Sequence, residues 1–256
     1  MAPIDYLVLR VVRHHLPSGV VHRLLRRGII IRPGTETRDP ATAFLRFKST
    51  IEGAGDKVVG KRILIFGYGG RTAVGAQLLQ AGAEQVVLLD PYVNAESAEI
   101  AGRLTLVHQP LDLYLAEGGA TVDLVLSNSV LEHVADMEST VRNLARVTRP
   151  EGQQFHFIDL RDHFFKYPFE MLCYSASTWR RFLNPGSNLN RLRIWDYERL
   201  FSAWFQQVAV TVRERLPEAF RAARPRIRPE FLSGDEARDS ATQILLQAGR
   251  RYSGGR

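Results

Sequence analysis

The chain has 256 residues and a mass of 28.9 kDa, enough for one α/β domain with additions. Its single cysteine, Cys173, excludes an internal disulfide and a cysteine-based zinc site, and no apolar run approaches the roughly 18 residues of a membrane span. The net charge of +7 is uneven, because residues 1–34 hold six arginines and one acid, Asp5. Such local charge can attract phosphates, anionic lipid or an acidic substrate, or it can be a solvated face. Because Arg10 interrupts the N-terminal apolar stretch, no signal peptide is recognisable, and we expect a cytoplasmic location.

Residues 1–60 are predicted to form a helical N-terminal extension that packs on the following domain or covers its cleft. The apolar stretch Tyr6–Leu16 and the segments 19–27 and 41–51 have helical patterns. The segment 28–40, rich in turn residues, is predicted to be a loop or a short strand.

Residues 61–256 form the predicted main domain, in which strands and helices alternate as in a mostly parallel α/β sheet covered on both faces. The predicted strands are 62–66, 85–89, 104–108, 122–127 and 154–160, and the predicted helices are 72–81, 95–102 and 137–147, the last capped by Asp136 and followed by a turn at 150–152. The alternation then ends. The remaining predicted parts are an aromatic-rich insert at 161–194, a helix at 195–206, and an antiparallel hairpin of strands 208–215 and 241–248.

The most informative motif follows the first predicted strand. Gly67, Gly69 and Gly70 lack a Cβ atom, so they can turn tightly and let a ligand approach the backbone. Asp90 ends the next strand, 21 positions after Gly69, where a carboxylate can bind both hydroxyls of a ribose. The combination predicts a site for an adenosine-containing cofactor. The alternative is a tight turn with a surface aspartate.

Two families begin with this pattern, the NAD(P)-binding domains and the class I S-adenosylmethionine-dependent methyltransferases. The later motifs favour the second. TVDLVLSNSVLEHV, residues 121–134, resembles that family's fourth motif, and RVTRPEG, residues 146–152, resembles the turn before its fifth strand. The resemblance, to methyltransferases of type 11, covers about residues 61–160. It implies an α/β, Rossmann-like class I methyltransferase sheet, mostly parallel with an antiparallel C-terminal strand, and S-adenosyl-L-methionine as cofactor.

The resemblance implies which residues would hold this cofactor. Gly67 and Gly69 would contact its methionine part through the backbone in a turn that Gly70 completes, and Asp90 would hold the ribose. The other implied contacts are Pro91 and Tyr92 beside the adenine, Asp112 or its rival Gln109 near the adenine amino group, and Ser127 and Asn128 beside the transferring methyl group. The chain departs from the family pattern at Ile65, where an acidic residue is common, and at Arg71, which replaces the third glycine. Arg71 would instead meet the cofactor carboxylate.

A hydroxyl acceptor would also lose a proton, and His133 and His163 are the candidate bases, since histidine exchanges protons near neutral pH. The alternatives are that His133 braces its loop and that His163 makes a surface hydrogen bond. Arg161 is the candidate partner for an acidic group on the acceptor. Tyr174 and Trp179 of the insert are candidates for holding a ring, a sugar or an acyl chain, or they pack a cap.

Metal binding is not expected. Glu132 and His133 resemble the end of a Glu-x-x-Glu-His motif that binds a divalent ion in some quinone-type methyltransferases. The first glutamate of that motif is Ser129 in this chain.

The predicted function is methyl transfer to a small-molecule, lipid- or sugar-linked acceptor. An NAD(P)-dependent oxidoreductase ranks lower because the chain has no Tyr-x-x-x-Lys pair, and Ile65 and Arg71 favour a non-catalytic cofactor-binding subunit as a further alternative. No Asn-Pro-Pro-aromatic motif for base methylation is present, which argues against nucleic acid as a partner.

The basic N-terminus predicts one more partner. Its positive charge stands beside apolar residues such as Leu7, Val11, Leu24 and Leu25. This combination favours peripheral contact with an anionic membrane at its inner surface.

Overall fold

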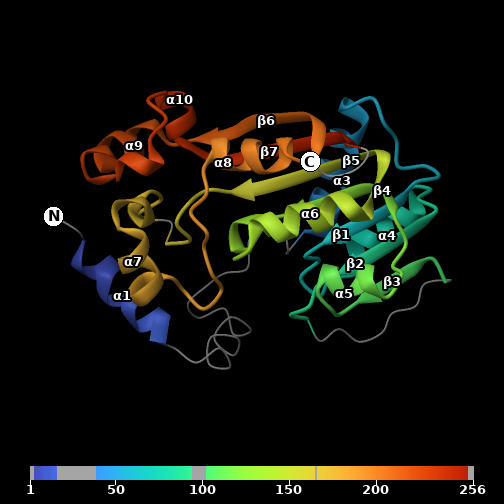
Figure 1. Ribbon diagram of the computed structural model, residues 1–256, viewed down its shortest axis with the longest axis horizontal. Coiled ribbons are helices and arrows are strands. Elements are labelled where there is room, and N and C mark those ends of the chain that lie inside the picture. Colours follow the sequence, from blue (N-terminus) through green and yellow to red (C-terminus); the bar gives the residue numbers. More distant parts are fainter. Residues whose placement is uncertain (1–2, 16–38, 94–101, 165, 253–256) are drawn as a thin grey trace.

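The computed structural model describes residues 3–15, 39–93, 102–164 and 166–252. Their central element is a seven-stranded sheet in the order β3-β2-β1-β4-β5-β7-β6 (Figure 1). The strands are β1 (Arg62–Phe66), β2 (Gln85–Leu89), β3 (Leu104–Val107), β4 (Val122–Asn128), β5 (Thr148–Asp159), β6 (Phe205–Arg215) and β7 (Ala241–Arg251). The pairs from β3 to β5 are parallel, whereas β7 runs antiparallel to both β5 and β6. The predicted fold class, with its antiparallel C-terminal strand, is confirmed.

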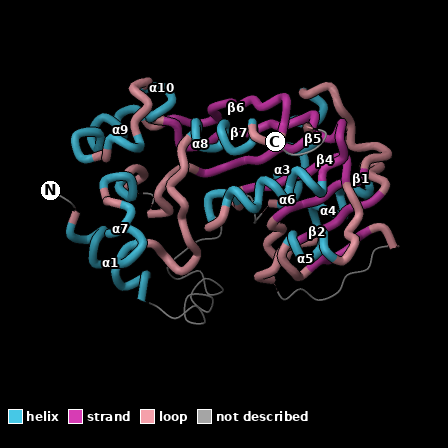
Figure 2. Tube along the Cα trace, in the orientation of Figure 1, coloured by secondary structure: helices cyan, strands magenta, loops and turns pink. Residues whose placement is uncertain are grey.

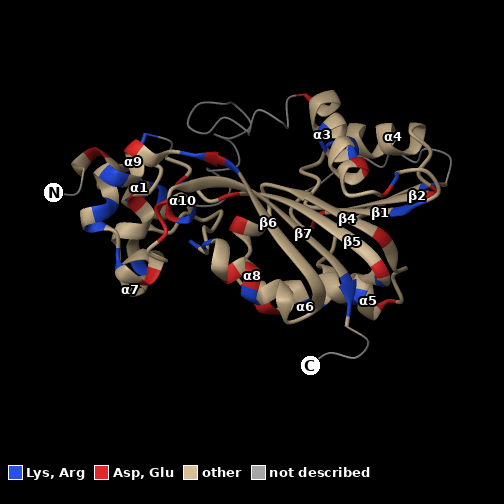
Figure 3. Cartoon of the chain, turned by 90° about the horizontal axis from the view of Figure 1, so that it is seen from above, with Lys and Arg blue, Asp and Glu red and all other residues tan. Residues whose placement is uncertain are grey.

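Helices cover both faces of the sheet. Seen from above in Figure 3, α3 (Pro40–Gly53) and α4 (Ala73–Gln80) lie on one face. On the other face lie α5 (Leu111–Ala116), α6 (Met137–Val147) and α8 (Ile194–Ser202). Because both faces are covered, the central strands are apolar along almost their whole length.

Two apolar clusters form these faces, and alternate residues of each strand enter alternate clusters. Leu64 of β1 packs in the cluster of α6 and α8, whereas its neighbours Ile63 and Ile65 pack with Phe47 and Ile51 of α3. Successive side chains of a strand point to opposite faces, and those on one face pack against α3. This helix of the N-terminal extension therefore contributes to the core of the main domain.

A separate group of helices lies beyond the carboxyl ends of the parallel strands, where the arrow of β5 points in Figure 1. Figure 2 shows the same group as short helices joined by loops. Its members are η3 (Glu170–Cys173), α7 (Ala176–Thr178), η4 (Trp179–Leu183), α9 (Pro217–Ala223), η5 (Arg224–Arg226), η6 (Pro229–Phe231), α10 (Glu236–Asp239) and the N-terminal helix α1 (Ile4–His15). We call this group the cap. It has its own apolar cluster, which includes Phe169, Trp179 and Phe220.

The bounds of several elements differ from the sequence predictions. The expected turn at 150–152 lies inside β5, which begins at Thr148 and pairs irregularly with the start of β4. The helix expected over 195–206 ends at Ser202, because the chain enters β6 at Phe205. The short helices α5 and α9 had no prediction. Asp136 caps α6 as expected, accepting from the Ser139 amide at 3.0 Å.

Two further predicted elements, the helix at 19–27 and most of the helix at 95–102, lie outside the described residues, as does most of the loop at 28–40. Among the helices that are described, none combines the length and the apolar character required to cross a bilayer.

Candidate functional site

The turn after β1 has a backbone conformation that favours glycine at three positions. Gly67, Gly69 and Gly70 have φ angles of 77°, 64° and 79°, in the left-handed region that side chains disfavour. A Cβ atom on Gly67 would lie 2.4 Å from a methyl carbon of Val130, and one on Gly70 would lie 2.8 Å from Val93. The turn is therefore packed between the chain that follows β4 and the chain that follows β2.

Asp90 lies directly beside this turn. Its Oδ2 accepts a hydrogen bond from the Gly69 amide and its Oδ1 accepts one from the Tyr92 amide, each at 3.0 Å. Each carboxylate oxygen has a lone pair beyond the one used, so both can also accept from vicinal hydroxyls. The Gly67 amide donates to the Leu89 carbonyl at 2.8 Å, so the first two glycine amides are engaged within the protein. The arrangement fits the ribose of an adenosine-containing cofactor.

The residues predicted to lie around the adenine are mostly at the surface. The Tyr92 side chain is 89% exposed, Asp112 is exposed in the first turn of α5, and Gln109 donates to Glu117 at 2.8 Å. Pro91 directly follows Asp90, and Arg71 is exposed after the glycine turn. Their contacts with a cofactor stay predictions.

A stacked pair that the sequence did not indicate lies at the same edge. The Tyr68 hydroxyl, inside the glycine turn, is 3.0 Å from Nε2 of His108, which follows β3. Their rings stack at 6.5 Å. This pair offers an aromatic surface close to the carboxylate of Asp90. Burial raises the pKa of Tyr68, and the charge of Asp90 is a smaller cause in the same direction.

At the end of β4 the two predicted residues have different surroundings. The Ser127 hydroxyl is buried and lies 2.7 Å from Nδ1 of the buried His156, so its side chain faces the core, and its place beside the methyl group stays a prediction. Asn128 accepts a hydrogen bond from the Arg46 guanidinium, which also lies 3.8 Å from the Phe157 ring centroid. Arg46 comes from α3. No motif in the sequence indicated it.

His133 is held in one tautomer. Its Nδ1 lies 3.0 Å from the Ser187 carbonyl oxygen and 2.8 Å from that of Asn188. Carbonyl oxygens only accept, so Nδ1 carries the proton and Nε2 keeps its lone pair. The Asn188 side chain returns a hydrogen bond to the His133 carbonyl at 3.0 Å, and Asn190 donates to the Leu131 carbonyl at 2.7 Å. The insert thus orients a candidate base, and sequence reasoning missed these asparagines.

The second predicted histidine lies against the first. The His133 and His163 rings are 4.8 Å apart at an interplanar angle of 66°. Burial, with the neighbouring His133 as a smaller cause, lowers the pKa of His163 to about 3. His163 is therefore neutral at pH 7 but a poor proton acceptor, which makes His133 the better base.

Glu132 completes this cluster. One carboxylate oxygen of Glu132 and one ring nitrogen each of His133 and His163 lie within 4.8 Å of one another. Glu132 is buried, its Oε2 has no hydrogen-bond partner, and burial raises its pKa well above the ordinary value. Three such donors could hold a divalent cation only if Glu132 lost its proton. The expectation that no metal binds stays a prediction.

The candidates for acceptor binding are engaged elsewhere. Arg161 donates to both oxygens of Asp159, at 2.9 and 2.7 Å, and lies 3.6 Å from Glu214, so its charge is compensated within the protein. The Tyr174 hydroxyl donates to Glu170 at 3.1 Å. Trp179 is buried in the cap. All three side chains thus have partners or packing within the protein, and their contact with an acceptor stays a prediction.

Helix α1 reaches the same region from the N-terminus. The Tyr6 hydroxyl donates to Asp162 at 2.5 Å, and the buried Arg10 guanidinium forms an ion pair with the same carboxylate. Arg10 also lies 5.1 Å from the ring centroid of Trp179. Because Asp162 directly precedes His163, α1 fixes the segment that carries the second histidine.

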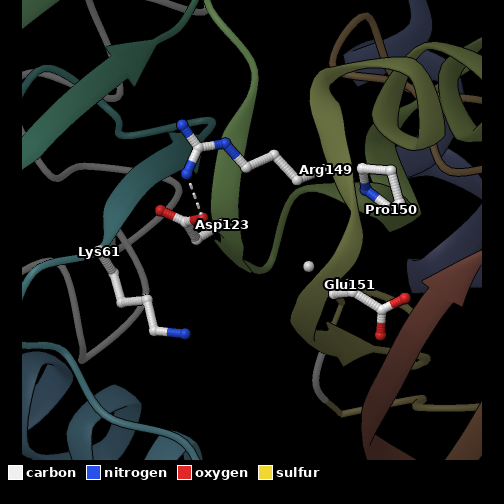
Figure 4. Close-up of a pocket in the computed structure, with 6 residues that line it drawn as sticks. Lys61, Asp123, Arg149, Pro150 and Glu151 are labelled. Carbon is white, nitrogen blue, oxygen red and sulfur yellow. Dashed lines mark hydrogen bonds and ion pairs between the residues drawn. The ribbon is translucent and has the colours of Figure 1, made fainter.

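A pocket at the opposite edge of the sheet is shown in Figure 4. It is lined by Lys61, Asp123, Arg149, Pro150, Glu151 and Gly152. Lys61 precedes β1 and Asp123 begins β4, so the pocket opens at the amino ends of the parallel strands. Arg149 pairs with Asp123 at 2.5 Å, and Lys61 pairs with Asp56 at 2.8 Å. Ligands of open α/β sheets bind at the carboxyl ends, and we place the functional site there.

Comparison with known proteins shows which proteins the chain is similar to. Residues 66–155 match a family model described as a methyltransferase domain. The chain is 30% identical over 117 residues to the ubiquinone biosynthesis O-methyltransferase of Vibrio campbellii, covering 43% of this chain and 48% of that protein. It is 31% identical over 104 residues to the protein of that name from Rhizobium rhizogenes, covering 38% and 40%. The chain therefore spans about half the length of the curated relatives it matches, or less.

One solved structure extends the likeness of fold over nearly the whole chain. The 1,6-didemethyltoxoflavin-N1-methyltransferase of Burkholderia thailandensis, solved with bound S-adenosylhomocysteine, superposes with a TM-score of 0.54 at 15% identity. The superposition covers 98% of this chain and 91% of the Burkholderia thailandensis chain. At this identity the likeness concerns the fold alone.

The pKa of His163 predicts a stability loss in acid. The folded-state pKa of about 3 lies below the ordinary 6.5, so stability is complete above pH 6.5 and falls as the pH drops toward 3. Between pH 6.5 and pH 5 the loss due to His163 is about 2 kcal/mol, at about 1.4 kcal/mol per pH unit. The buried His156, whose pKa burial also lowers to about 3, adds a loss of its own, so the share of His163 is the difference between the wild type and a variant without it. Urea unfolding of the wild type and of His163→Gln at both pH values measures it. If the variant loses as much stability as the wild type, His163 is not the group responsible.

Proposed function

We propose that this chain, which belongs to the class I S-adenosylmethionine-dependent methyltransferases, transfers a methyl group to a hydroxyl oxygen of a small-molecule, lipid- or sugar-linked acceptor. The observation that carries the proposal is the fixed tautomer of His133 at the carboxyl edge of the sheet. Val130, three positions before it, packs directly on Gly67 of the cofactor turn. The candidate base and the candidate cofactor site are thus parts of one packed unit.

The residues at this edge suit the cofactor. S-adenosylmethionine, when bound, supplies a methyl group already activated by the sulfonium. Asp90 would accept hydrogen bonds from the ribose hydroxyls, and Tyr68 with His108 would offer a surface for the base. Asn128, fixed by Arg46, would border the methionine end. The protein's main task is alignment of the acceptor with the methyl group.

The proton of the acceptor hydroxyl would pass to Nε2 of His133. On taking this proton His133 would become an imidazolium, and the carbonyls of Ser187 and Asn188 would still accept a hydrogen bond from its Nδ1–H. His133 would later release the proton to water. His163 is neutral and adds no charge beside the cationic cofactor, and burial, which raises the pKa of Glu132, disfavours a charge on that carboxyl.

The names of the curated relatives support an oxygen acceptor, since those proteins are ubiquinone biosynthesis O-methyltransferases. The segment that matches the family model, residues 66–155, contains the glycine turn, Asp90 and His133. The cap, which would contact the acceptor, lies outside the matched segment of the family model. We therefore propose a hydroxyl on a small or lipid-linked molecule and name no particular compound.

The topology of the sheet argues against one of the two alternative functions and leaves the other to an activity measurement. A dinucleotide-dependent oxidoreductase would have a parallel sheet of order 3-2-1-4-5-6, whereas here the antiparallel β7 lies between β5 and β6. A non-catalytic cofactor-binding subunit shares the fold and the cofactor site, so only an activity measurement separates it from an enzyme.

The function is tested by methyl transfer from labelled S-adenosylmethionine into a cell extract, followed by separation into lipid, nucleic-acid and small-molecule fractions. We expect label in the lipid or small-molecule fraction, with the methyl group on oxygen by mass spectrometry. Label confined to nucleic acid, or cofactor binding without transfer to any fraction, would reject the proposed enzyme.

Asp90→Ala removes the carboxylate that would hold the ribose. We expect the affinity for S-adenosylhomocysteine to fall by about 1–3 kcal/mol, the scale of lost charge-assisted hydrogen bonds. Isothermal titration calorimetry measures this loss, with Glu138→Ala, an exposed acid in the first turn of α6, as the control. Unchanged affinity in a folded Asp90→Ala protein would exclude the assigned role.

His133→Ala removes the proposed base and leaves the cofactor turn intact. We expect kcat to fall about 100- to 10,000-fold, the usual range for general base catalysis, with little change in affinity for S-adenosylhomocysteine. EDTA should leave the wild-type rate unchanged. A rate that EDTA abolishes and a divalent ion restores would instead assign His133, His163 and Glu132 to a metal site.

A further inference from the structure

Helix α1 is amphipathic, but the side that it buries carries Tyr6 and Arg10 and the side that it exposes is aliphatic. These two buried residues bind Asp162 in the segment after β5, whereas the aliphatic residues of the helix other than Leu7 face outward. The exposed aliphatic residues are Ile4 (77% exposed), Val8 (56%), Leu9 (48%), Val11 (39%) and Val12 (51%). With 3.6 residues per turn, these positions form one continuous face, which we call the α1 face.

The sequence prediction for this region is changed in part. Val11 belongs to the α1 face, but Leu7 packs against the apolar cluster of the cap. Leu24 and Leu25 lie outside the described residues. A continuous aliphatic face on a helix that is held in place by its polar side marks a surface that contacts an apolar partner.

The charge around the α1 face favours lipid as that partner. Its only acid, Asp5, is paired with Lys166 at 2.8 Å and accepts from the Tyr167 hydroxyl at 2.8 Å, so the face has no uncompensated negative charge. The sequence directly after α1 adds four arginines before its next acid, Glu36. Aliphatic residues combined with an excess of arginine fit the interface of an anionic bilayer.

We propose that the α1 face docks on an anionic lipid bilayer, with Ile4, Val8, Leu9, Val11 and Val12 inserted into its interfacial region. Figure 1 and Figure 3 both place α1 at the outer end of the cap, on the far side of the molecule from α5. The inward side of α1 contacts Asp162, next to His163, so the docked face lies over the part of the cap nearest the cluster of histidines. Only this relation between the docked face and the histidine cluster rests on the proposed function.

The test is co-sedimentation of the full chain with vesicles of phosphatidylcholine mixed with phosphatidylglycerol, and with vesicles of phosphatidylcholine alone. We expect the partition coefficient to be at least about tenfold higher on the anionic vesicles at low salt and to fall at high salt. The double variant Val8→Asp, Val12→Asp should lower binding to anionic vesicles at least about tenfold. The neutral double variant Val8→Gln, Val12→Gln should weaken vesicle binding less than the acidic one does. It replaces the acidic double variant in the test if that protein misfolds.

Leu113→Asp is the matched control, because Leu113 is also an exposed aliphatic residue on a helix, 49% exposed on α5. It should bind vesicles as the wild type does. Equal sedimentation of the wild type and both Val8, Val12 variants would overturn the proposal, as would absence of binding to anionic vesicles. So would a stable dimer in light scattering that the acidic pair dissociates, since a second copy would then cover the face. Binding of S-adenosylhomocysteine, measured separately, decides the proposed function independently of this result.

Discussion

The carboxyl edge of the sheet depends on the absence of a side chain at Gly67. The methyl groups of Val130 occupy the space that a Cβ atom there would need, so the chain leaving β4 runs directly over the turn that leaves β1. The same left-handed turn directs the Gly69 amide to Asp90. One backbone conformation thus joins the carboxylate suited to a ribose and the segment that carries His133. A larger residue at position 67 would separate these strand ends, whatever its chemistry.

Burial limits the charge on the two residues that lie against His133. Burial makes a charge costly on both: it raises the pKa of Glu132 well above its ordinary value and lowers the pKa of His163 to about 3, so that His163 is uncharged at neutral pH. A cationic cofactor and a proton-accepting imidazole can coexist more easily there than beside a second fixed cation. Orientation comes from the segment between η4 and α8, because backbone carbonyls of Ser187 and Asn188 accept a hydrogen bond from Nδ1–H. Main-chain acceptors fix the tautomer without adding charge.

The two described helices of the N-terminal extension serve different parts of the molecule. Helix α3 packs on the sheet through Phe47 and Ile51 and sends Arg46 to Asn128. Helix α1 packs on the cap through Arg10, whose buried guanidinium is stabilised by Asp162 and by the ring of Trp179. An ion pair buried in this way is weak support for stability by itself, but it specifies orientation. That orientation turns the aliphatic side of α1 outward.

The sequence by itself determined the order of the strands and helices, the glycine turn, Asp90 and the antiparallel ending, because each depends on local patterns of apolar residues, glycines and caps. His133 and His163 were also recognisable as candidates, since their residue type and their places after β4 and β5 carry the signal. Only the tertiary structure decided which partners these groups have. Arg161 is compensated by Asp159, Ser127 faces the core, and Arg46, Asn188 and Asn190 reach the site from distant segments. These outcomes depend on side chains brought together over long sequence separations, where burial and hydrogen bonding decide and no local pattern records the contact.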